Sequence, residues 1–325
     1  MNVLGIETSC DETAASVVGP DGVLSDVIHT QKIHEEYLGV VPELASRAHA
    51  EKIAAVTRAA LERAGIERPD AVAATAGPGL IGAVLVGLSY GQAYASALGV
   101  PFIGVNHLEG HLLSTLLEDP APEFPFLGLL ISGGHTTLYL AHALGDYELI
   151  STTVDDAAGE AFDKVARVLG LPYPGGPHID RLAQSGDPTS IAFPRPRASG
   201  EDMSFSGLKT AVRNYALKKD SLPPEQIAAS FQGAVVDVLM KRVVNAIERT
   251  GVRRVALSGG VAANSAIREA FSSMEGVETF IPPRSRCTDN ASMIANVGRL
   301  RLLRGEVDAP GVGARSGWQL TRAEG

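Results

Sequence analysis

The sequence predicts an α/β protein made of two related domains with a ligand cleft between them. Three observations favour this fold class. Short apolar strands alternate with helices along the chain. The pattern of strand, polar turn and strand appears at residues 3–18 and again at residues 126–141. Finally, 325 residues are more than one ordinary hydrophobic core organises. A duplicated α/β unit that binds a ligand between its halves would combine these features.

The elements of the first half follow from apolar periodicity, with Gly65 as a helix stop and Asn106 as an N-cap. Strands are expected at Val3–Ile6, Ala14–Val18, Ala71–Ala76 and Pro101–Val105, and helices at Pro42–Ala64, Leu80–Leu98 and His107–Leu117.

The second half repeats the opening pattern and then adds helices. Strands are expected at Phe126–Ile131, Thr136–Ala141, Asp146–Thr153 and Arg254–Leu257, and helices at Pro224–Thr250, from Ser258 through Ala270, and at Asp289–Leu303. Residues 171–206 are rich in Pro, Gly, Ser and Arg and are expected to form a long excursion. The tail after Asp308 is expected to be loose.

We place the first domain at residues 1–106 and the second, which would carry the metal and nucleotide site, at residues 107–304. The tail, residues 305–325, is expected to pack back on the first domain. From Ala71 to Leu108 there is no charged side chain. Because Gly and Pro cut this stretch into strand, helix and strand, we interpret its middle as a fully buried core helix and expect no membrane span.

Composition indicates an ordinary globular protein without a disulfide scaffold. Cys10 and Cys287 are the two cysteines, which suits a reducing compartment. The N-terminus lacks the basic and apolar regions of a signal peptide, so a cytoplasmic protein is expected. The net charge of −9 argues against an extensive nucleic-acid-binding surface of the chain's own.

Three polar or glycine-rich turns follow strands and suit a nucleotide. Ser132-Gly133-Gly134 and Ser258-Gly259-Gly260 would let backbone N–H groups point at an anion. The turn Glu7–Glu12 offers hydroxyls and carboxylates for a cation that accompanies phosphates. Each turn alone is an ordinary feature, and three together favour a nucleotide site. Neither a Walker A motif nor a dinucleotide-binding fingerprint is present.

His107 and His111 lie four residues apart on an expected helix, which places both imidazoles on one face. This spacing is typical of a metal clamp, although two ordinary polar residues would share it. In zinc peptidases a Glu directly follows the first His. Here Leu108 takes that position, and Glu109 points to the opposite face. A metallopeptidase is therefore disfavoured.

At this point the sequence resembles a known family across its whole length. It is similar to the universal tRNA N6-threonylcarbamoyladenosine transferases, the glycoprotease-like family of the actin-like ATPase superfamily (sugar kinases, Hsp70 and actin). The matching motifs run in order: Gly5–Thr13, Gly77–Gly79, His107–His111, Ile131–Thr136, Gly159–Lys164, Pro174–Pro177, Ser204–Lys209, Ser258–Asn264 and Cys287–Ala291.

The resemblance implies the roles of individual residues. It assigns His107, His111 and Asp289 to one divalent metal ion, and Asp11 and Glu12 to the reacting end of the cleft. Its substrate-binding residues form two groups. The grip on phosphate and acyl group is Leu130, Ile131, Ser132, Gly133 and Gly134, and the nucleoside contacts are Asp163, Gly176, Asp180 and Asn264.

One position departs from part of the family. Archaeal and eukaryotic relatives often carry a Tyr that can reach the metal where this chain has Leu130, which cannot be a ligand. The sequence is therefore of bacterial type, and positions on the metal remain open for water or substrate. Two imidazoles and one carboxylate suit Fe(II), Zn(II) and other ions, and we favour Fe(II) over Zn(II).

The expected activity is transfer of threonylcarbamoyl from threonylcarbamoyl-AMP to N6 of the adenosine next to the anticodon, in tRNAs that read codons starting with A. The resemblance also implies two partners besides tRNA, a paralogous actin-like subunit and a small ATPase. The alternatives are an actin-like ATPase or kinase and, less favoured, the metallopeptidase.

Overall fold

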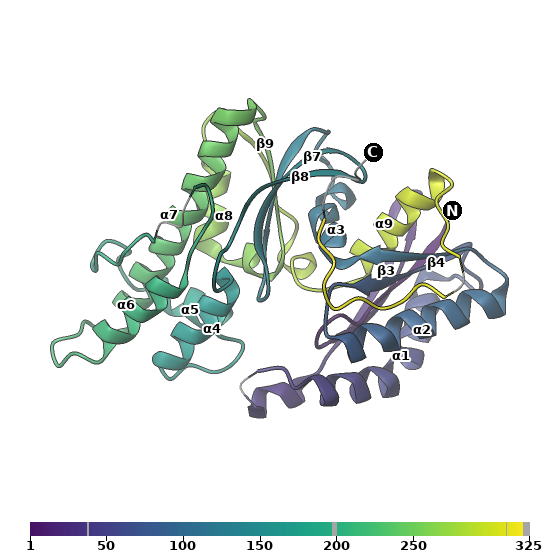
Figure 1. Cartoon of the computed structure of the whole chain (residues 1–325). Coiled ribbons are helices and arrows are strands. Elements are labelled where there is room, and N and C mark those ends of the chain that lie inside the picture. Colours follow the sequence, from purple (N-terminus) through teal and green to yellow (C-terminus); the bar gives the residue numbers. More distant parts are fainter. Residues whose placement is uncertain (38, 197–199, 310, 321–325) are drawn as a thin grey trace. The chain divides into compact units, whose positions relative to one another are not determined.

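The computed structural model describes residues 1–37, 39–196, 200–309 and 311–320. The chain folds into two compact units (Figure 1). Unit 1 contains Met1–Asp119 and Asp289–Leu320, and unit 2 contains Pro120–Thr288. The first unit therefore extends beyond the boundary expected between residues 106 and 107. His107 and His111 belong to unit 1, because the segment that carries them packs there together with the last helix of the chain.

Unit 1 has a five-stranded sheet in the order β3-β2-β1-β4-β5. β1, β2 and β3 form an antiparallel meander, and β4 and β5 add parallel to β1. The strands are β1 Val3–Glu7, β2 Glu12–Gly19, β3 Gly22–Thr30, β4 Ala71–Gly77 and β5 Phe102–Asn106. The helices are η1 Lys32–Tyr37, α1 Pro42–Ala64, α2 Ile81–Leu98, α3 His107–Leu112, η2 Ser114–Leu117 and α9 Ala291–Leu303. β3 was not expected from the sequence.

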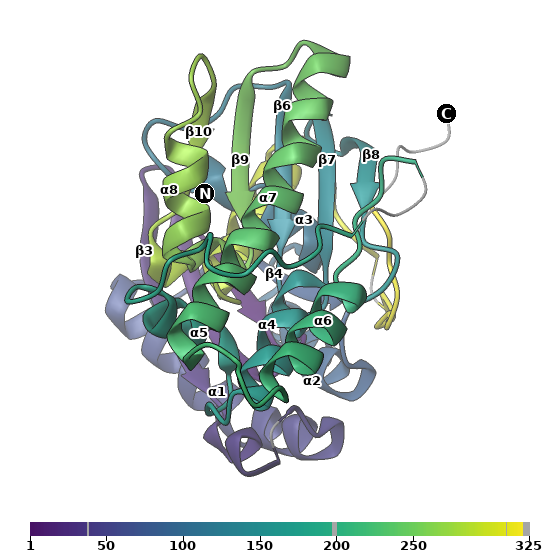
Figure 2. The same cartoon turned by 90° about the vertical axis from the view of Figure 1, so that its left-hand side faces the viewer.

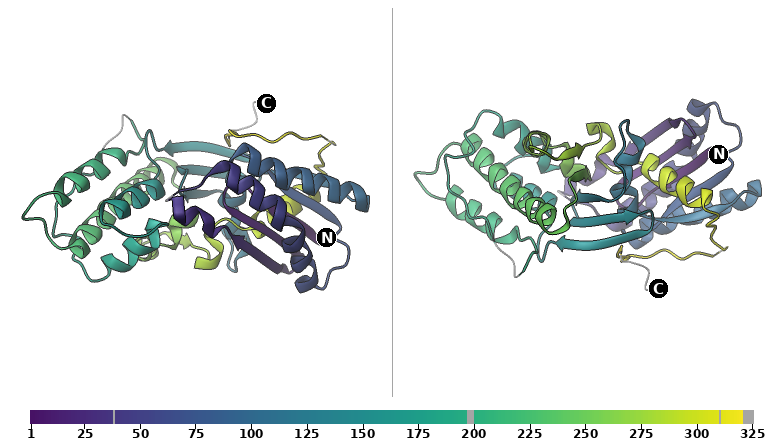
Figure 3. Two further views of the ribbon diagram at one scale, coloured as in Figure 1. Left: turned by 90° about the horizontal axis from the view of Figure 1, so that it is seen from below. Right: turned by 90° about the horizontal axis from the view of Figure 1, so that it is seen from above.

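Helices cover both faces of this sheet, with α1 and α2 on one face and α9 on the other (Figures 1 and 3). Leu4 and Ile6 of β1 face α1 and α2, and the alternation of a strand turns Gly5 and Glu7 toward the other face. Gly5 has no room for a side chain, since a Cβ there would lie 2.4 Å from the Ala291 carbonyl oxygen. α9 therefore lies directly on β1.

Unit 2 repeats the topology of unit 1. Its sheet has the order β10-β9-β6-β7-β8, with an antiparallel meander of β6, β7 and β8 and parallel additions of β9 and β10. The strands are β6 Phe126–Ile131, β7 Thr136–Ala143, β8 Asp146–Thr152, β9 Arg254–Ser258 and β10 Glu278–Phe280. The helices are α4 Ala158–Val168, α5 Gly175–Ala183, α6 Ser206–Ala216, α7 Pro224–Thr250, η3 Gly260–Ala263, α8 Ser265–Ser272 and η4 Arg284–Arg286. Figure 2 shows α4 to α8 in front of the sheet. The duplication expected from the sequence is present in this shared strand order.

Several expected elements differ from the structure. The excursion at residues 171–206 contains α5, and its Ile191, Phe193, Met203 and Phe205 are buried in the core of unit 2. Ser258-Gly259-Gly260 does not open a long helix, because Gly259 has a φ of 86° and α8 begins only at Ser265. The expected helix His107–Leu117 is divided into α3 and η2.

The tail is held on unit 1 as far as residue 320. Arg315 N donates to Ala76 O at 2.8 Å, and Gln92 Nε2 donates to Val312 O at 2.7 Å. The expectation of a loose tail after Asp308 is therefore wrong for the stretch from Val312 to Trp318, and residues 310 and 321–325 lie outside the described part of the chain.

Among the described residues, α2 alone has the length and apolar composition of a helix that could cross a membrane. Only 33% of its most apolar stretch is buried, so it is not the fully buried core helix expected from the sequence. Its buried face, which includes Ala83, Leu88 and Gly91, packs against the sheet of unit 1, and Ile81 and Leu85 are exposed.

Candidate functional site

The two histidines are positioned by the residue that ends β5. The Asn106 side chain accepts the N–H of Leu108 at 2.8 Å and caps α3, as expected from the sequence. Cap and helix place His107 and His111 one turn apart, with ring centroids 4.7 Å from each other. Both side chains are buried. Their ring nitrogens therefore converge in a space that is shielded from bulk water.

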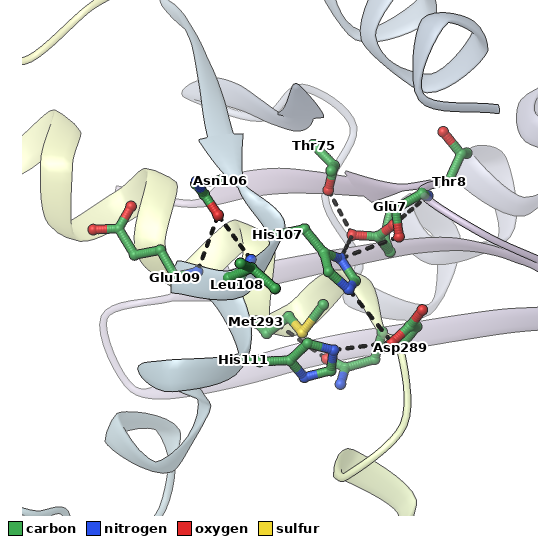
Figure 4. A network of polar contacts seen from close by, with 12 residues as sticks. Glu7, Thr8, Thr75, Asn106, His107, Leu108, Glu109, His111, Asp289 and Met293 are labelled. Carbon is green, nitrogen blue, oxygen red and sulfur yellow. Dashed lines mark hydrogen bonds and ion pairs between the residues drawn. The ribbon is translucent and has the colours of Figure 1, made fainter. Parts of the chain in front are cut away.

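Asp289 completes a cluster of three possible metal ligands (Figure 4). Its Oδ1 lies 2.9 Å from His111 Nε2 and 3.7 Å from His107 Nε2. One ligand atom from each of the three residues lies within 4.8 Å of the other two. The sequence analysis expected Asp289 to begin the last helix, but α9 begins at Ala291 and Asp289 precedes it. Asn290 caps α9, because its side-chain oxygen accepts the N–H of Met293. The cluster lies entirely within unit 1.

Glu7 lies next to His107, and the sequence analysis did not distinguish it from the rest of its turn. Its Oε2 lies 2.9 Å from His107 Nδ1 and accepts the Thr75 hydroxyl at 2.5 Å, while Oε1 accepts the N–H of Ser9. With Nδ1 directed at Glu7, Nε2 of His107 faces Asp289 and is the nitrogen that a metal ion would take (Figure 4). Such a carboxylate behind a histidine is typical of metal sites.

Charges shift the pKa values of this pair. Burial acts to lower the pKa of His107, but Glu7 and Asp289 outweigh it and raise that pKa to about 9. Burial acts to raise the pKa of Glu7, and the adjacent His107 lowers it on balance. Glu7 and Asp289 therefore stabilise the positively charged form of the His107 ring, whose Nδ1 proton is directed at Glu7.

Asp11 and Glu12 lie at the start of β2, close enough to the cluster to feel its charge. Burial, then Asp289 and then Asp11 raise the pKa of Glu12 to about 10, and Glu12 shares a hydrogen bond with Asp11. Carboxylates thus crowd around two imidazoles at low solvent exposure. A divalent cation would relieve this repulsion. Nδ1 of His111 is buried without a hydrogen-bond partner among the described residues. The donor set fits a divalent metal ion.

Glu109 points away from the histidines, as the helical geometry predicted (Figure 4). It is buried and receives two N–H groups of Arg301 on α9, with Arg301 Nη2 2.7 Å from Glu109 Oε1. Glu109 is thus engaged in holding α3 to α9. It is not placed as the base of a zinc peptidase.

The loop at the end of β6 offers backbone rather than side chains. Leu130 and Ile131 are buried and paired in the sheet, so their side chains are not available to grip a phosphate. Ser132 N donates to His135 O at 2.7 Å, which closes the turn. Gly133 and Gly134 are exposed, and a Cβ at either position would meet no atom within 4 Å. Space beside these two residues would admit a ligand.

The four expected nucleoside contacts are engaged in hydrogen bonds within unit 2. Asp163 Oδ1 accepts the N–H of Gly175 at 2.7 Å and, with a second bond from Gly176, holds the start of α5. Asp180 accepts both the N–H and the hydroxyl of Ser265 at the start of α8. Asn264 caps α8 through Ile267 N and donates to Gln232 at 2.7 Å. These residues hold the N-terminal ends of α5 and α8.

The structure therefore brings the predicted residues together in two groups. His107, His111 and Asp289 meet in unit 1, near Asp11 and Glu12. The nine expected substrate-binding residues all belong to unit 2.

Comparison with known proteins decides the family. The model of the family "TsaD: tRNA N6-adenosine threonylcarbamoyltransferase" matches residues 22–296. A protein of that name from Anaeromyxobacter dehalogenans strain 2CP-C is 53% identical, over 98% of this chain and 99% of its own. The chain belongs to this family. A second member, from Chromobacterium violaceum, is 48% identical over 99% of this chain and 98% of its own. The activity of this transferase is threonylcarbamoylation of N6 of a tRNA adenosine.

Solved structures show the fold of the transferase. HypF from T. kodakarensis superposes with a TM-score of 0.66 at 16% identity, over 94% of this chain and 48% of HypF. The activator of 2-hydroxyisocaproyl-CoA dehydratase from Clostridium difficile gives 0.55 at 15% identity, over 95% of this chain and 99% of its own. The transferase therefore has the actin-like fold expected from the sequence. Its family implies a divalent metal, for which the triad offers ligands.

Proposed function

We propose that this transferase takes threonylcarbamoyl from threonylcarbamoyl-AMP and places it on the adenosine adjacent to the anticodon, in tRNAs reading codons that start with A. The main observation in support of this proposal is the triad of His107, His111 and Asp289, in which Glu7 holds the Nδ1 proton of His107. An ATPase or kinase of this fold needs no such site. The family match supports the tRNA substrate.

His107, His111 and Asp289 would hold the ion, and we favour Fe(II) over Zn(II) for two imidazoles and one carboxylate. When bound, the ion supplies Lewis-acid polarisation of a carbonyl or phosphate oxygen of the donor. Glu7 fixes the orientation of the His107 ring, which keeps the ligand set in place before the substrates arrive.

In the transfer step a C–N bond forms between N6 and the carbamoyl carbon, and the bond from that carbon to the phosphate oxygen breaks. AMP leaves with the bonding electron pair, and N6 loses one proton. Asp11 positions the amine or accepts that proton, and Glu12 orients Asp11 through their shared hydrogen bond.

Unit 2 would bind the donor. Backbone N–H groups of Gly133 and Gly134 suit a developing negative charge, because open space lies beside them. The chain from Leu130 to Ser132 acts through backbone rather than side chains. Asp163, Gly176, Asp180 and Asn264 would serve the nucleoside. Their hydrogen bonds hold the starts of α5 and α8, so contacts within unit 2 position this part of the site.

We further propose that tRNA affinity is shared with partner proteins, a paralogous actin-like subunit and a small ATPase. The net charge of −9 supports this, because an acidic chain repels the phosphate backbone. Such a complex would work in the cytoplasm, where its tRNA lies, without binding to a membrane.

A transfer assay tests the proposal. The protein, with and without candidate partners, is incubated with labelled threonylcarbamoyl-AMP and unmodified tRNA, and label on nucleosides is counted. We expect label on adenosine that is lost in His111→Ala. His142→Ala, at a partly exposed histidine paired with Glu148, serves as the control and should keep activity. No label under any partner or metal condition, with ATP still converted to ADP, would overturn the proposal.

A further inference from the structure

We propose that His49 is a positioning residue of the transfer reaction, which fixes the turn that carries Asp11 and Glu12. This inference rests on the proposed function of those two carboxylates. His49 lies on α1, is fully buried, and is part of no motif that the sequence analysis singled out.

The two ring nitrogens of His49 have different partners. Nε2 lies 3.0 Å from the carbonyl oxygen of Cys10, and Nδ1 lies 2.8 Å from the hydroxyl of Thr13. Because a carbonyl can only accept, the proton is on Nε2, and Nδ1 accepts from Thr13. Burial lowers the pKa of His49, which agrees with one proton on the ring.

Gln31 and His34, both buried, extend the polar contacts of His49. Gln31 Nε2 lies 3.3 Å from Nδ1 and 3.4 Å from Nε2 of His49 and donates to Ala45 O at 3.3 Å, and Gln31 Oε1 accepts from His34 Nε2 at 3.0 Å. His34 Nδ1 in turn accepts the N–H of Val41 at 3.3 Å. With one proton on each imidazole, Nε2 of His34 donates to Gln31 and Nε2 of His49 donates to the Cys10 carbonyl.

Three successive carbonyls of the turn are held from outside it. Ser9 O accepts from Leu80 N at 2.9 Å, Asp11 O accepts from Gln31 N at 3.1 Å, and Cys10 O accepts from His49. The peptide groups before and after Asp11 are therefore both fixed. Only the Cys10 carbonyl is held by a side chain, so substitution at His49 alters this restraint directly.

A packing role alone does not account for the polar residues. Thr13 lies on the face of β2 that also carries Ala15 and Val17, which pack in the apolar core with Ile53 and Val56 of α1. Apolar side chains would fill the places of Thr13 and His49 without needing hydrogen bonds. What the polar pair adds is the bond to the turn.

Two substitutions test the roles of the two ring nitrogens of His49 one at a time. In His49→Gln the side-chain amide reaches the place of Nε2 and can still donate to Cys10 O. In His49→Asn the amide reaches only the place of Nδ1, so it can pair with Thr13 but leaves the Cys10 carbonyl without its donor. We expect His49→Asn to lower kcat by at least about tenfold, because small displacements of reacting groups are costly. KM for the donor and affinity for Co²⁺ should stay unchanged. His49→Gln should retain most of kcat.

The measurement combines kinetics with hydrogen–deuterium exchange of the full-length protein. In His49→Asn, and not in His49→Gln, amide exchange should increase at residues 9–13 and remain unchanged in unit 2. In an Asp11→Asn background, His49→Asn should cause no further loss, because both changes act through one group.

Equal kcat in His49→Asn and the parent, or unaltered exchange at residues 9–13, would overturn the proposal. Equal losses in both His49 variants, or fully additive losses with Asp11→Asn, would also overturn it and leave a structural role. A parent without transfer activity would sink the proposed function instead, and the exchange experiment would still decide whether His49 holds the turn.

Discussion

Nδ1 of His107 lies 2.9 Å from Oε2 of Glu7, so the two residues share a proton on the side of the imidazole that faces away from Asp289. They are 100 positions apart in the chain. One comes from the end of β1 and the other from the start of α3. The pair sets which ring nitrogen is available to a metal ion, and this makes Glu7 the first residue to test.

Glu7→Gln should weaken metal binding by about 10- to 100-fold, the usual effect of removing a partner behind a ligand. The amide keeps the size of the side chain but not its charge. Titration of the metal-free protein with Co²⁺ measures the affinity. Thr75→Val is a matched control that removes only the hydroxyl donor of Glu7 and should have a smaller effect. Equal affinity in the parent and Glu7→Gln would contradict the role of Glu7.

Glu109→Gln should lower stability and leave metal affinity as it is. Glu109 is buried and Arg301 is partly buried, so the change removes the charge partner of a guanidinium inside unit 1. We expect a loss of about 1–3 kcal/mol in the free energy of unfolding by urea. A drop in Co²⁺ affinity as large as that of Glu7→Gln would show that Glu109 acts at the metal after all.

Gly5→Ala should reduce both stability and metal affinity. The added Cβ would lie 2.4 Å from the Ala291 carbonyl oxygen and 2.7 Å from the Ala295 Cβ, so α9 must move off β1. Overpacking of this kind costs about 1–3 kcal/mol. Asp289 directly precedes α9 and would move as well. Gly207→Ala on α6, where the nearest atom is 3.6 Å from the new Cβ, is the control. If Gly5→Ala leaves the metal affinity unchanged, the position of α9 does not determine the geometry of the metal site.

Because of His49, the free energy of unfolding should fall when the pH drops below 6.5, the ordinary pKa of histidine. Burial lowers its pKa in the folded state from 6.5, so the unfolded chain binds the proton more readily. The free energy of unfolding therefore falls as pH drops below 6.5. Urea unfolding between about pH 7 and about pH 5 should show a smaller loss in His49→Gln than in the parent. His107, whose pKa is raised to about 9, contributes with the opposite sign and at higher pH. Equal losses would contradict a lowered pKa at His49.

Local signals predicted the long helices well. α1 and α7 have the expected bounds because each begins at a Pro and is followed by a Gly in the left-handed conformation, Gly65 with a φ of 65° and Gly251 with a φ of 73°. The cap of α3 by Asn106 was also predicted, because Asn is a favoured residue at the N-cap. The excursion was misjudged because α5 has only 9 residues and little periodicity in a Pro- and Gly-rich segment.

The candidate site was predictable only where residues lie in recognisable motifs. His107 and His111 share one turn of helix, and the family resemblance supplied Asp289. Glu7 and His49 were missed because their partners are remote in sequence. Thr75 is 68 positions from Glu7, and Cys10 is 39 positions from His49. Local patterns carry no information on such contacts.

The return of α9 to unit 1 also orders events during protein synthesis. Residues 1–119 leave the ribosome long before residues 289–320, which complete the same unit, whereas unit 2 is continuous from Pro120 to Thr288. Until α9 emerges, it cannot cover the face of β1 around Gly5, and His107 and His111 lack the carboxylate of Asp289. Unit 2 can finish folding first. The metal centre, although its first ligand is His107, can form only after the whole of unit 2 has been synthesised.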